Sequence, residues 1–568
     1  MVSVFVGCSS AHLTGGVTEK TSVRLASYKM ESTENRDRLN SQNTALNKWL
    51  RFLIIVILVM GIFFRFANLE KKVYWIDEAY TSLRISGYTE SEFIEQVADG
   101  QIREIQYLQK YQRINSEKTV YDTVKGLALE EPQLAPLYFI ATRFWVQLFG
   151  DSIAVTRSIS AVFSLLALPC MYWLCLELFD SSLAAWLGVS LLAVSPFQIV
   201  YAQEARPYSL FVLVILLSGA ALLQAMRLKT NSSWAIYAAT VALGFYSHLL
   251  FALVALGHGI YVAISEKLRF KNTIIGYLLA SITGIIAFFP WILVFIINYQ
   301  NVNQKIAWQS LKIPLPDLAV NWVYNIAKQF FDLGIDSNVP RLYSRLILLL
   351  ILIIVAYSFY LLLKYTEQRV WLFVMTLTCV IVVIFLPADI IFGGIRSLNT
   401  RYMIPCYLGI QIAVAYLFAS KITSPQVTVQ LQKLWRLGFA AVLSVGIISC
   451  CIYLPADTWW NKDRSYINIP IARTINSASR PLVITDMWVY SVDKIGNLLG
   501  MSSLINSPAK FLVLPPKIID IPDNFNEIFL YDISPTIKSE IEKNNRYIIQ
   551  NIYPQTNQSM IFGKLVKK

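Results

Sequence analysis

Charged side chains are scarce in this chain of 568 residues. Asp, Glu, Lys and Arg make up only 15% of it, whereas 55% of the residues are hydrophobic and the mean hydropathy is +0.50. Soluble proteins usually carry about a quarter charged residues. The composition therefore excludes a soluble enzyme of several domains and a mainly disordered chain, and it predicts an integral membrane protein.

Histidine and paired cysteine are also scarce. The chain has three histidines, at positions 12, 248 and 258, and seven cysteines that form no Cys-x-x-Cys pair. These residues exclude a zinc cage and a disulfide framework. The sequence specifies no cofactor and no metal ligands, and it leaves the binding of a divalent cation open.

Positive charge is in excess, with 49 Lys and Arg against 36 Asp and Glu, for a net charge of +13. In a soluble chain this excess would suggest nucleic acid as a partner. In a membrane protein it follows from the enrichment of Lys and Arg in cytoplasmic loops. We therefore expect no nucleic-acid partner.

Apolar runs that could cross a bilayer, which takes roughly 20 helical residues, recur along the chain. The first, Trp49–Phe66, has Lys48 and Arg51 at its start, which predicts a cytoplasmic N-terminus. Further runs cover residues 152–179, 183–200, 207–226, 273–297, 342–363, 370–386, 402–420 and 434–454.

Two other apolar stretches are harder to assign. Residues 135–149 would span only about 22 Å as a helix, so we expect this helix to lie in the outer interface. Residues 233–265 would span roughly 48 Å, and basic residues flank them on both sides. We expect a helical hairpin that turns outside near His248. Every strongly basic short loop is then cytoplasmic, and the count is eleven spans.

The predicted fold is an all-α polytopic membrane protein of about 11 transmembrane helices with a small extracytoplasmic α/β domain. The short β-rich runs 481–485, 511–514, 528–531 and 547–552 predict that domain. The predicted parts are a disordered cytoplasmic tail at 1–48, starting at Met1 or Met30, a membrane domain at 49–455 with outer loops at 67–134 and 298–341, and the α/β domain at 456–568.

Asp77 and Glu78 follow the first span by about ten residues and are flanked by Tyr74, Trp75 and Tyr80. Aromatic neighbours of this kind favour the membrane interface. Adjacent carboxylates repel each other, and partial desolvation raises their proton affinity, so one of them can serve as a general base. A solvated acidic turn would explain the pair without catalysis.

The segment 195–209 joins two spans at the outer face and contains Glu204, Arg206 and Tyr208. Pro207 can open the following helix, which places Arg206 beside a positive helix N-terminus. Guanidinium and helix N-terminus together suit a phosphate. The alternative is an Arg206–Glu204 ion pair that only closes a hairpin.

Two further polar groups are predicted at the outer face. His248 lies at the hairpin turn, and Arg401-Tyr402 begins a later span. A hydrogen-bonded helix end and an interfacial anchor are their alternative explanations. The outer loop 298–341, with Trp308, Gln309 and Trp322, could shape an acceptor or sugar pocket.

These motifs, in this order, resemble those of the GT-C membrane glycosyltransferases. The closest subgroup is the bacterial family similar to dolichyl-phosphate-mannose–protein mannosyltransferases, known as glycosyltransferase family 39 or PMT_2, with the lipid A aminoarabinose transferases more distant. The resemblance covers about residues 49–455. It rests on Asp77-Glu78, Ala135-Pro136-Leu137-Tyr138, Phe149-Gly150, Arg157, Ser195-Pro196, Gln203-Glu204-Ala205-Arg206-Pro207-Tyr208, Tyr246-Ser247-His248 and Arg401-Tyr402.

The resemblance implies a polyprenyl-phosphate-linked sugar donor and an extracytoplasmic active site in the cell membrane. It implies that Asp77 is the catalytic base or an acceptor-orienting carboxylate, with Glu78 beside it. Arg206, Arg401 and His248 would engage the donor phosphate. Glu204, Tyr208 and Tyr402 belong to the same motifs and are expected at the same site. Residues 101–125 depart from the family pattern as an insertion, and the tail is no recognisable carbohydrate-binding module.

The leading hypothesis is therefore an inverting glycosyltransferase that acts on an extracytoplasmic protein, lipid or glycan. A transporter or flippase of lipid-linked glycans is the main alternative, and a scaffold whose outer domain binds a partner is a third. Transporters place charges at the bilayer midplane, often in repeated halves. Here the charges cluster at one predicted face, and the sequence shows no internal repeat.

Overall fold

The computed structural model describes residues 50–269, 272–334, 341–487, 492–506, 508–515, 525–543, 546–553 and 562–568. Met60–Lys568 form one compact unit, and the helix of residues 50–66 begins before it. The predicted tail at 1–48 and the choice between Met1 and Met30 lie outside the described residues.

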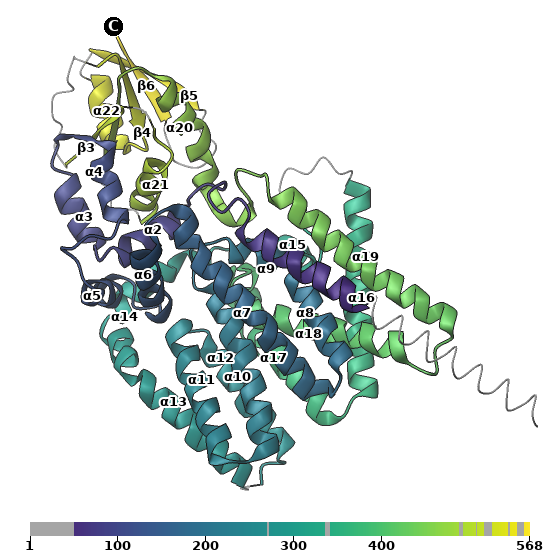
Figure 1. Ribbon diagram of the computed structural model, residues 1–568. Helices are drawn as coiled ribbons and strands as arrows, with labels where there is room; N and C mark the ends of the chain where they lie inside the picture. The colour runs from purple at the N-terminus through teal and green to yellow at the C-terminus, as the bar shows by residue number, and fades with distance from the viewer. Residues whose placement is uncertain are drawn as a thin grey trace, which may run out of the picture. The chain divides into compact units, whose positions relative to one another are not determined.

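Apolar helices, most of them long, make up most of this unit (Figure 1). They are α7 (Ile153–Phe179), α8 (Ser182–Ala193), α9 (Pro196–Ala202), α10 (Tyr208–Leu228), α11 (Asn231–Ser247), α12 (Phe251–Ser265), α13 (Asn272–Ile297), α16 (Arg341–Tyr365), α17 (Gln368–Phe392), α18 (Ile404–Thr423) and α19 (Val429–Tyr453).

Seven of the described helices are long and apolar enough to cross a membrane, and the pair α8 and α9, bent by 59°, would make an eighth. This count is lower than the predicted eleven. The helix 50–66, α11 with 17 residues and α12 with 15 residues account for the difference, because they are shorter than a typical span. The hairpin turns where predicted, since α11 ends at Ser247 and α12 begins at Phe251.

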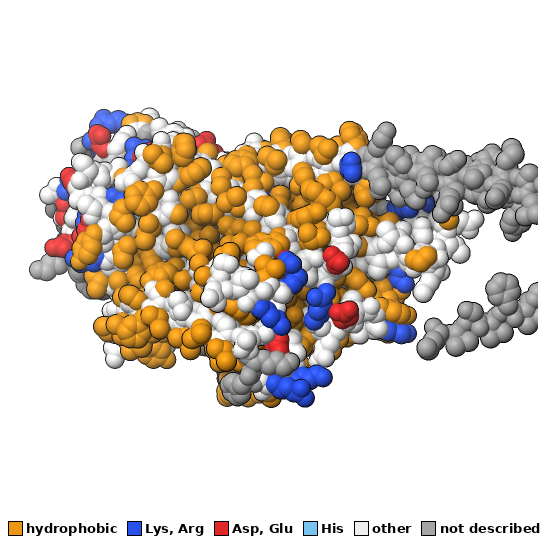
Figure 2. Space-filling model, turned by 60° about the horizontal axis from the view of Figure 1, so that its bottom comes forward, with side chains coloured by type: hydrophobic (Ala, Val, Ile, Leu, Met, Phe, Trp, Pro, Cys, Tyr) orange, Lys and Arg blue, Asp and Glu red, His pale blue; other side chains and the backbone are white. Residues whose placement is uncertain are grey.

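The helices carry an extended apolar surface. On α13, large apolar side chains such as Leu279, Ile286 and Ile296 are exposed. Figure 2 shows hydrophobic side chains over a broad continuous area of one face, with Lys, Arg, Asp and Glu gathered outside it. A soluble protein rarely exposes such an area, whereas lipid accommodates it. The chain is therefore a multi-pass membrane protein.

Short helices and a six-stranded sheet lie together at one end of the long helices (Figure 1). The short helices are α2 (Ile76–Ile85), α3 (Glu90–Val97), α4 (Ile105–Gln109), η1 (Lys110–Gln112), α5 (Val120–Glu130), α6 (Leu137–Phe149), α14 (Tyr299–Ile306), η2 (Ala307–Ser310), α15 (Leu315–Ala327), η3 (Arg396–Leu398), η4 (Trp460–Ile467), α20 (Asn468–Ser477), α21 (Val492–Ser502) and α22 (Pro535–Lys543).

The sheet confirms the predicted α/β tail. Its strands are β1 (Ile102–Glu104), β2 (Pro481–Asp486), β3 (Lys510–Leu514), β4 (Glu527–Tyr531), β5 (Tyr547–Tyr553) and β6 (Phe562–Lys567), in the spatial order β1-β3-β2-β4-β6-β5. β2 pairs in parallel with β3 and β4, and the other neighbours are antiparallel. All six residues of β2 are buried, as its central place requires.

The first outer loop completes this sheet. β1 comes from the predicted insertion 101–125 and pairs with β3, with Ile102 opposite Leu512. Leu108 and Tyr111 then join Val483 and Phe511 in one buried core. The insertion therefore joins the first outer loop to the tail.

Helix α6 forms within the stretch predicted as an interfacial helix. Its charged residue, Arg143, is buried and does not reach solvent. The guanidinium donates to the carbonyls of Ile85, at 2.5 Å, and Lys118. Arg143 thus satisfies backbone groups of the first outer loop, which explains a charge in the middle of an apolar helix.

Candidate active site

Helix α2 carries both predicted carboxylates and begins immediately before them. Trp75 is its N-cap residue, and the Glu78 side chain accepts a hydrogen bond from the Trp75 backbone N–H at 3.5 Å. Acidic residues in a first helical turn also interact favourably with the helix dipole. Successive residues of a helix point about 100° apart, so Asp77 and Glu78 enter different environments.

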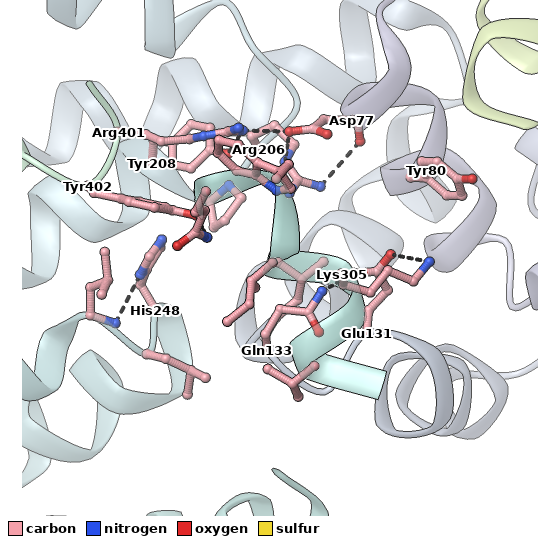
Figure 3. A pocket seen from close by; sticks show the side chains of 18 of the residues that line it. Asp77, Tyr80, Glu131, Gln133, Arg206, Tyr208, His248, Lys305, Arg401 and Tyr402 are labelled. Carbon is pink, nitrogen blue, oxygen red and sulfur yellow. Dashed lines mark hydrogen bonds and ion pairs between the residues drawn. The ribbon is translucent and has the colours of Figure 1, made fainter. Parts of the chain in front are cut away.

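Asp77 faces two arginines from distant parts of the chain (Figure 3). Arg401 Nη1 lies 2.6 Å from Asp77 Oδ2, and Arg206 Nε lies 3.7 Å from the same oxygen. Arg206 also donates to the Asp77 carbonyl and to the Thr81 hydroxyl, each at 3.2 Å. The Arg206 guanidinium thus contacts Asp77 and Thr81. The hydrogen bond between Arg206 and Glu204 joins backbone groups, with the Arg206 N–H as donor and the Glu204 carbonyl as acceptor.

The electrostatics of Asp77 correct the expectation of raised proton affinity. Burial alone would raise the pKa of this carboxyl, but Arg206 and Arg401 outweigh burial and lower it below its ordinary value. Asp77 is therefore ionised at neutral pH while both arginines face it.

Glu78 is completely buried and points away from Asp77. Arg157, on α7, holds it in a two-pronged ion pair with both nitrogen–oxygen distances at 2.7 Å. The Ala205 backbone N–H and Lys462 Nζ each donate to it at 2.9 Å. Burial opposes ionisation, but Arg157 and Lys462 lower the pKa of Glu78 to about 2. Glu78 is thus an ionised structural anchor beneath Asp77.

Glu204 belongs to the same buried cluster. It accepts a hydrogen bond from the Asn461 amide and lies 3.7 Å from Lys462 Nζ. Burial raises the pKa of Glu204 to about 7, although Lys462 acts in the opposite direction. Sequence reasoning missed Lys462, because nothing in its local sequence distinguishes it from an ordinary surface lysine.

A cavity of about 590 Å³ opens beside Asp77. Six of the eight predicted site residues line it, and Glu78 and Glu204 do not. The six are Asp77, Arg206, Tyr208, His248, Arg401 and Tyr402. They come from α2, the turn before α10 and the first residue of α10, the α11–α12 turn and the segment before α18.

Arg401 organises one side of this cavity. Its Nη1 also donates to the Tyr208 hydroxyl at 2.7 Å, and its guanidinium carbon lies 5.8 Å from the Trp75 ring centre and 5.9 Å from that of Trp308. Aromatic faces stabilise a cation without neutralising it. Tyr402, the next residue, accepts a hydrogen bond from Gln309 at 2.8 Å.

His248 is a neutral group in this cavity. Its ring stacks on Phe211 with centroids 4.5 Å apart, and its Nδ1 accepts from the Leu250 backbone N–H at 3.2 Å. Burial, together with Arg206 and Arg401, lowers its pKa to about 3. Since Nδ1 accepts, the ring proton is assigned to Nε2, and His248 can offer one neutral hydrogen bond.

The opposite wall holds residues that sequence reasoning did not select, namely Tyr80, Glu131, Gln133 and Lys305. Lys305, from α14 in the second outer loop, lies 3.5 Å from Glu131 and 2.9 Å from Glu90. Gln309 and Trp308 of the same loop also line the cavity, as the sequence suggested, whereas Trp322 donates to Ser397 and is not part of the lining.

Within the described residues, no group of three or more His, Cys, Asp or Glu side chains is arranged to hold a metal ion. On the cavity wall, Asp77 pairs with Arg206 and Arg401, Glu131 pairs with Lys305, and several aromatic rings face the same space.

The comparisons agree with this fold. Residues 131–294 match the family of dolichyl-phosphate-mannose-protein mannosyltransferases. The whole chain has the fold of ArnT from Cupriavidus metallidurans in the apo state, at 13% identity and a TM-score of 0.53, over 92% of this chain and 98% of that one. No curated protein sequence matches the chain.

Two further solved structures are similar. ArnT from the same organism bound to undecaprenyl phosphate has a TM-score of 0.49 at 13% identity, over 90% of this chain and 97% of that one. The archaeal oligosaccharyltransferase AglB from Archaeoglobus fulgidus, in complex with an inhibitory peptide and a dolichol-phosphate, has a TM-score of 0.47 at 11% identity. That match covers 82% of this chain and 64% of that one.

The fold and site define a multi-pass membrane protein with an ionised carboxylate and two arginines in one cavity. The family match over residues 131–294 and the fold agree with the resemblance found in the sequence, that to the GT-C membrane glycosyltransferases.

Proposed function

We propose that the protein transfers a sugar from a polyprenyl-phosphate-linked donor to an extracytoplasmic acceptor in the cell membrane, with inversion at the anomeric carbon. The observation that carries this proposal is the contact of Asp77 with Arg401 and Arg206 on the wall of one cavity. A carboxylate beside two guanidinium groups combines a proton acceptor with a phosphate site.

The reaction is a single displacement. The acceptor hydroxyl oxygen bonds to the anomeric carbon as the bond from that carbon to the phosphate oxygen breaks. The electron pair leaves with the lipid phosphate, where Arg206 and Arg401 stabilise the developing charge. Asp77 orients the hydroxyl and takes its proton.

Donor binding also activates Asp77 in this scheme. Arg401 contacts Asp77 directly, and this contact keeps the pKa of the carboxyl low. A phosphate that takes over part of the arginine hydrogen bonding weakens its hold on Asp77, and the proton affinity of the carboxylate rises. The base thus becomes stronger once the leaving group is in place.

Several observations support a lipid-linked donor over a nucleotide sugar. The matched family is described by a dolichyl-phosphate-linked sugar. The connection between α18 and α19, predicted to be cytoplasmic, is only residues 424–428, too short to fold a nucleotide-binding domain. The lipid chain of a donor could lie against the exposed apolar helices, at about 0.8 kcal/mol per buried methylene.

Purified protein in detergent, offered each donor separately, tests this proposal. We expect release of polyprenyl phosphate from a polyprenyl-phosphate sugar. NMR of the product should show that the transferred sugar has the anomeric configuration opposite to that in the donor. Asp77→Asn is the matched control. Turnover of a nucleotide sugar alone, or retention of configuration, would contradict the proposal.

A further inference from the structure

The segment between the last long helix and the sheet packs against the start of α2. Lys462, in η4, is completely buried, with its Nζ 2.9 Å from Glu78 Oε2 and 3.7 Å from Glu204 Oε2. Three residues later, the Ser465 hydroxyl accepts the backbone N–H of Ile76, the first residue of α2, at 3.3 Å. One short segment therefore contacts both the start of α2 and the carboxylate behind it.

The charges of this cluster alternate. Arg157, Glu78, Lys462 and Glu204 form a chain of two cations and two carboxylates, all of them buried. Lys462 is the one member that touches both carboxylates. Removing one partner from such a cluster leaves an uncompensated buried charge, which is strongly unfavourable.

We infer that Lys462 is a positioning residue for the transfer reaction, which ties the extracytoplasmic tail to the orientation of Asp77 and Arg206. The inference rests on the proposed function. Glu78 is adjacent to Asp77 on α2, and Glu204 lies two residues before Arg206, so the two contacts of Lys462 fix both sides of the Asp77–Arg206 pair. The extracytoplasmic domain thereby takes part in building the site.

The ionisation of Glu204 gives this role a pH signature. Several charged or titratable groups act on Glu204 or on Lys462, and these are Glu78, Asp77, Arg401, Arg157, Lys72, Tyr201 and Tyr453. Lys462 is the cation that most lowers the pKa of Glu204, which burial raises to about 7. Without Lys462 this pKa rises further, so Glu204 is neutral at low pH and repels Glu78 only at higher pH.

Three variants of the cluster, and one control variant outside it, test the inference. We expect Lys462→Met to lower kcat by about tenfold or more at about pH 8, with a smaller loss at about pH 6. In Lys462→Met/Glu204→Gln the cluster is again neutral, so most of the activity returns and the added pH dependence disappears. Lys462→Arg keeps the charge and should retain more activity than Lys462→Met.

Lys71→Met is the control. Lys71 forms an exposed ion pair with Asp457 at 2.8 Å, so it joins the same two segments outside the cluster, and we expect activity like that of the parent. Hydrogen exchange over α2 gives a readout that needs no donor, with faster exchange in Lys462→Met at high pH only.

Parent kinetics in Lys462→Met would overturn the inference. So would a double variant as impaired as the single one, or an equal loss in Lys71→Met. If Lys462→Met does not accumulate, Lys462→Arg and the double variant decide the question, and inactivity of both overturns it. A parent protein that uses no polyprenyl-phosphate sugar would instead contradict the proposed function and leave the hydrogen-exchange result standing.

Discussion

At the scale of single residues, Asp77 and Glu78 are adjacent carboxylates with different surroundings. Asp77 lines the cavity, whereas Glu78 is fully buried against Arg157 and Lys462. We expect Asp77→Asn to reduce turnover about 100- to 10,000-fold with a smaller fall in the thermal unfolding temperature than Glu78→Gln causes, because Asp77 is partly exposed and asparagine can still accept a hydrogen bond from Arg401.

Glu78→Gln should affect stability more directly than the chemical step. Two buried cations then face one carboxylate fewer, which costs about 3 to 5 kcal/mol of stability, and the thermal unfolding temperature falls markedly. Near-normal turnover of Asp77→Asn would refute its role, and an unchanged unfolding temperature of Glu78→Gln would refute the anchor.

Arg206 lies between Asp77 and the donor phosphate in the proposed mechanism. Lysine keeps the charge but loses the planar fork, so Arg206→Lys should weaken donor binding less than Arg206→Ala does. Binding of a polyprenyl phosphate to the purified variants measures this. Arg227→Ala is the control, because Arg227 is an exposed arginine that pairs with Glu177. Equal binding by all three variants would remove Arg206 from the phosphate site.

Local sequence identified the charged residues around Asp77 on the cavity wall, but not the lysine that completes the buried cluster. Asp77, Arg206 and Arg401 were recognisable because charged residues beside apolar spans are unusual. Lys462 and Lys305 were not, because their partners lie hundreds of residues away or in another loop. The raised proton affinity predicted for the Asp77-Glu78 pair was wrong, since the arginines that lower it come from distant segments.

At the scale of elements, α2 depends on close contact with α21. A Cβ added at Gly500 would lie 2.5 Å from the Tyr74 carbonyl oxygen, just before α2. Gly500→Ala should therefore displace α2 and lower both the unfolding temperature and kcat, with a cost of about 1 to 3 kcal/mol that exceeds the gain in helix propensity.

Gly438→Ala on α19 is the matched control, because its Cβ would meet only Phe418 at 3.7 Å. We expect this variant to be as active as the parent and at least as stable. Equal unfolding temperatures and equal kcat for Gly500→Ala and the parent would show that α21 does not fix the position of α2.

Strands with a regular apolar pattern were predictable, and β1 was not. The four predicted β-rich runs became β2, β3, β4 and β5, because apolar β-branched residues bounded by turns are typical of strands. β1 has only three residues, two of them charged, and it forms through pairing with β3. No local pattern could reveal that pairing.

At the scale of the whole molecule, the orientation in the membrane remains a prediction from the basic loops. Lys421, Lys433 and Arg436 flank the short α18–α19 connection, and cytoplasmic loops are enriched in such residues. A reporter that is active only in the cytoplasm should therefore be silent when fused after Lys568 and active when inserted at 424–428. The reverse pattern would invert the topology.

The joining of β1 to β3 sets an order of events during synthesis. Gln109 donates to the carbonyl of Ser502, 393 residues further along the chain, and at 5 to 20 residues per second the ribosome needs roughly 20 to 80 s to cover that distance. On the predicted topology, the first outer loop has by then crossed the membrane without the strand that pairs with β1. Lys462 is likewise made only after the last long helix. In the proposed scheme, the newly made chain therefore completes its site, and transfer activity begins, only after the tail has been made.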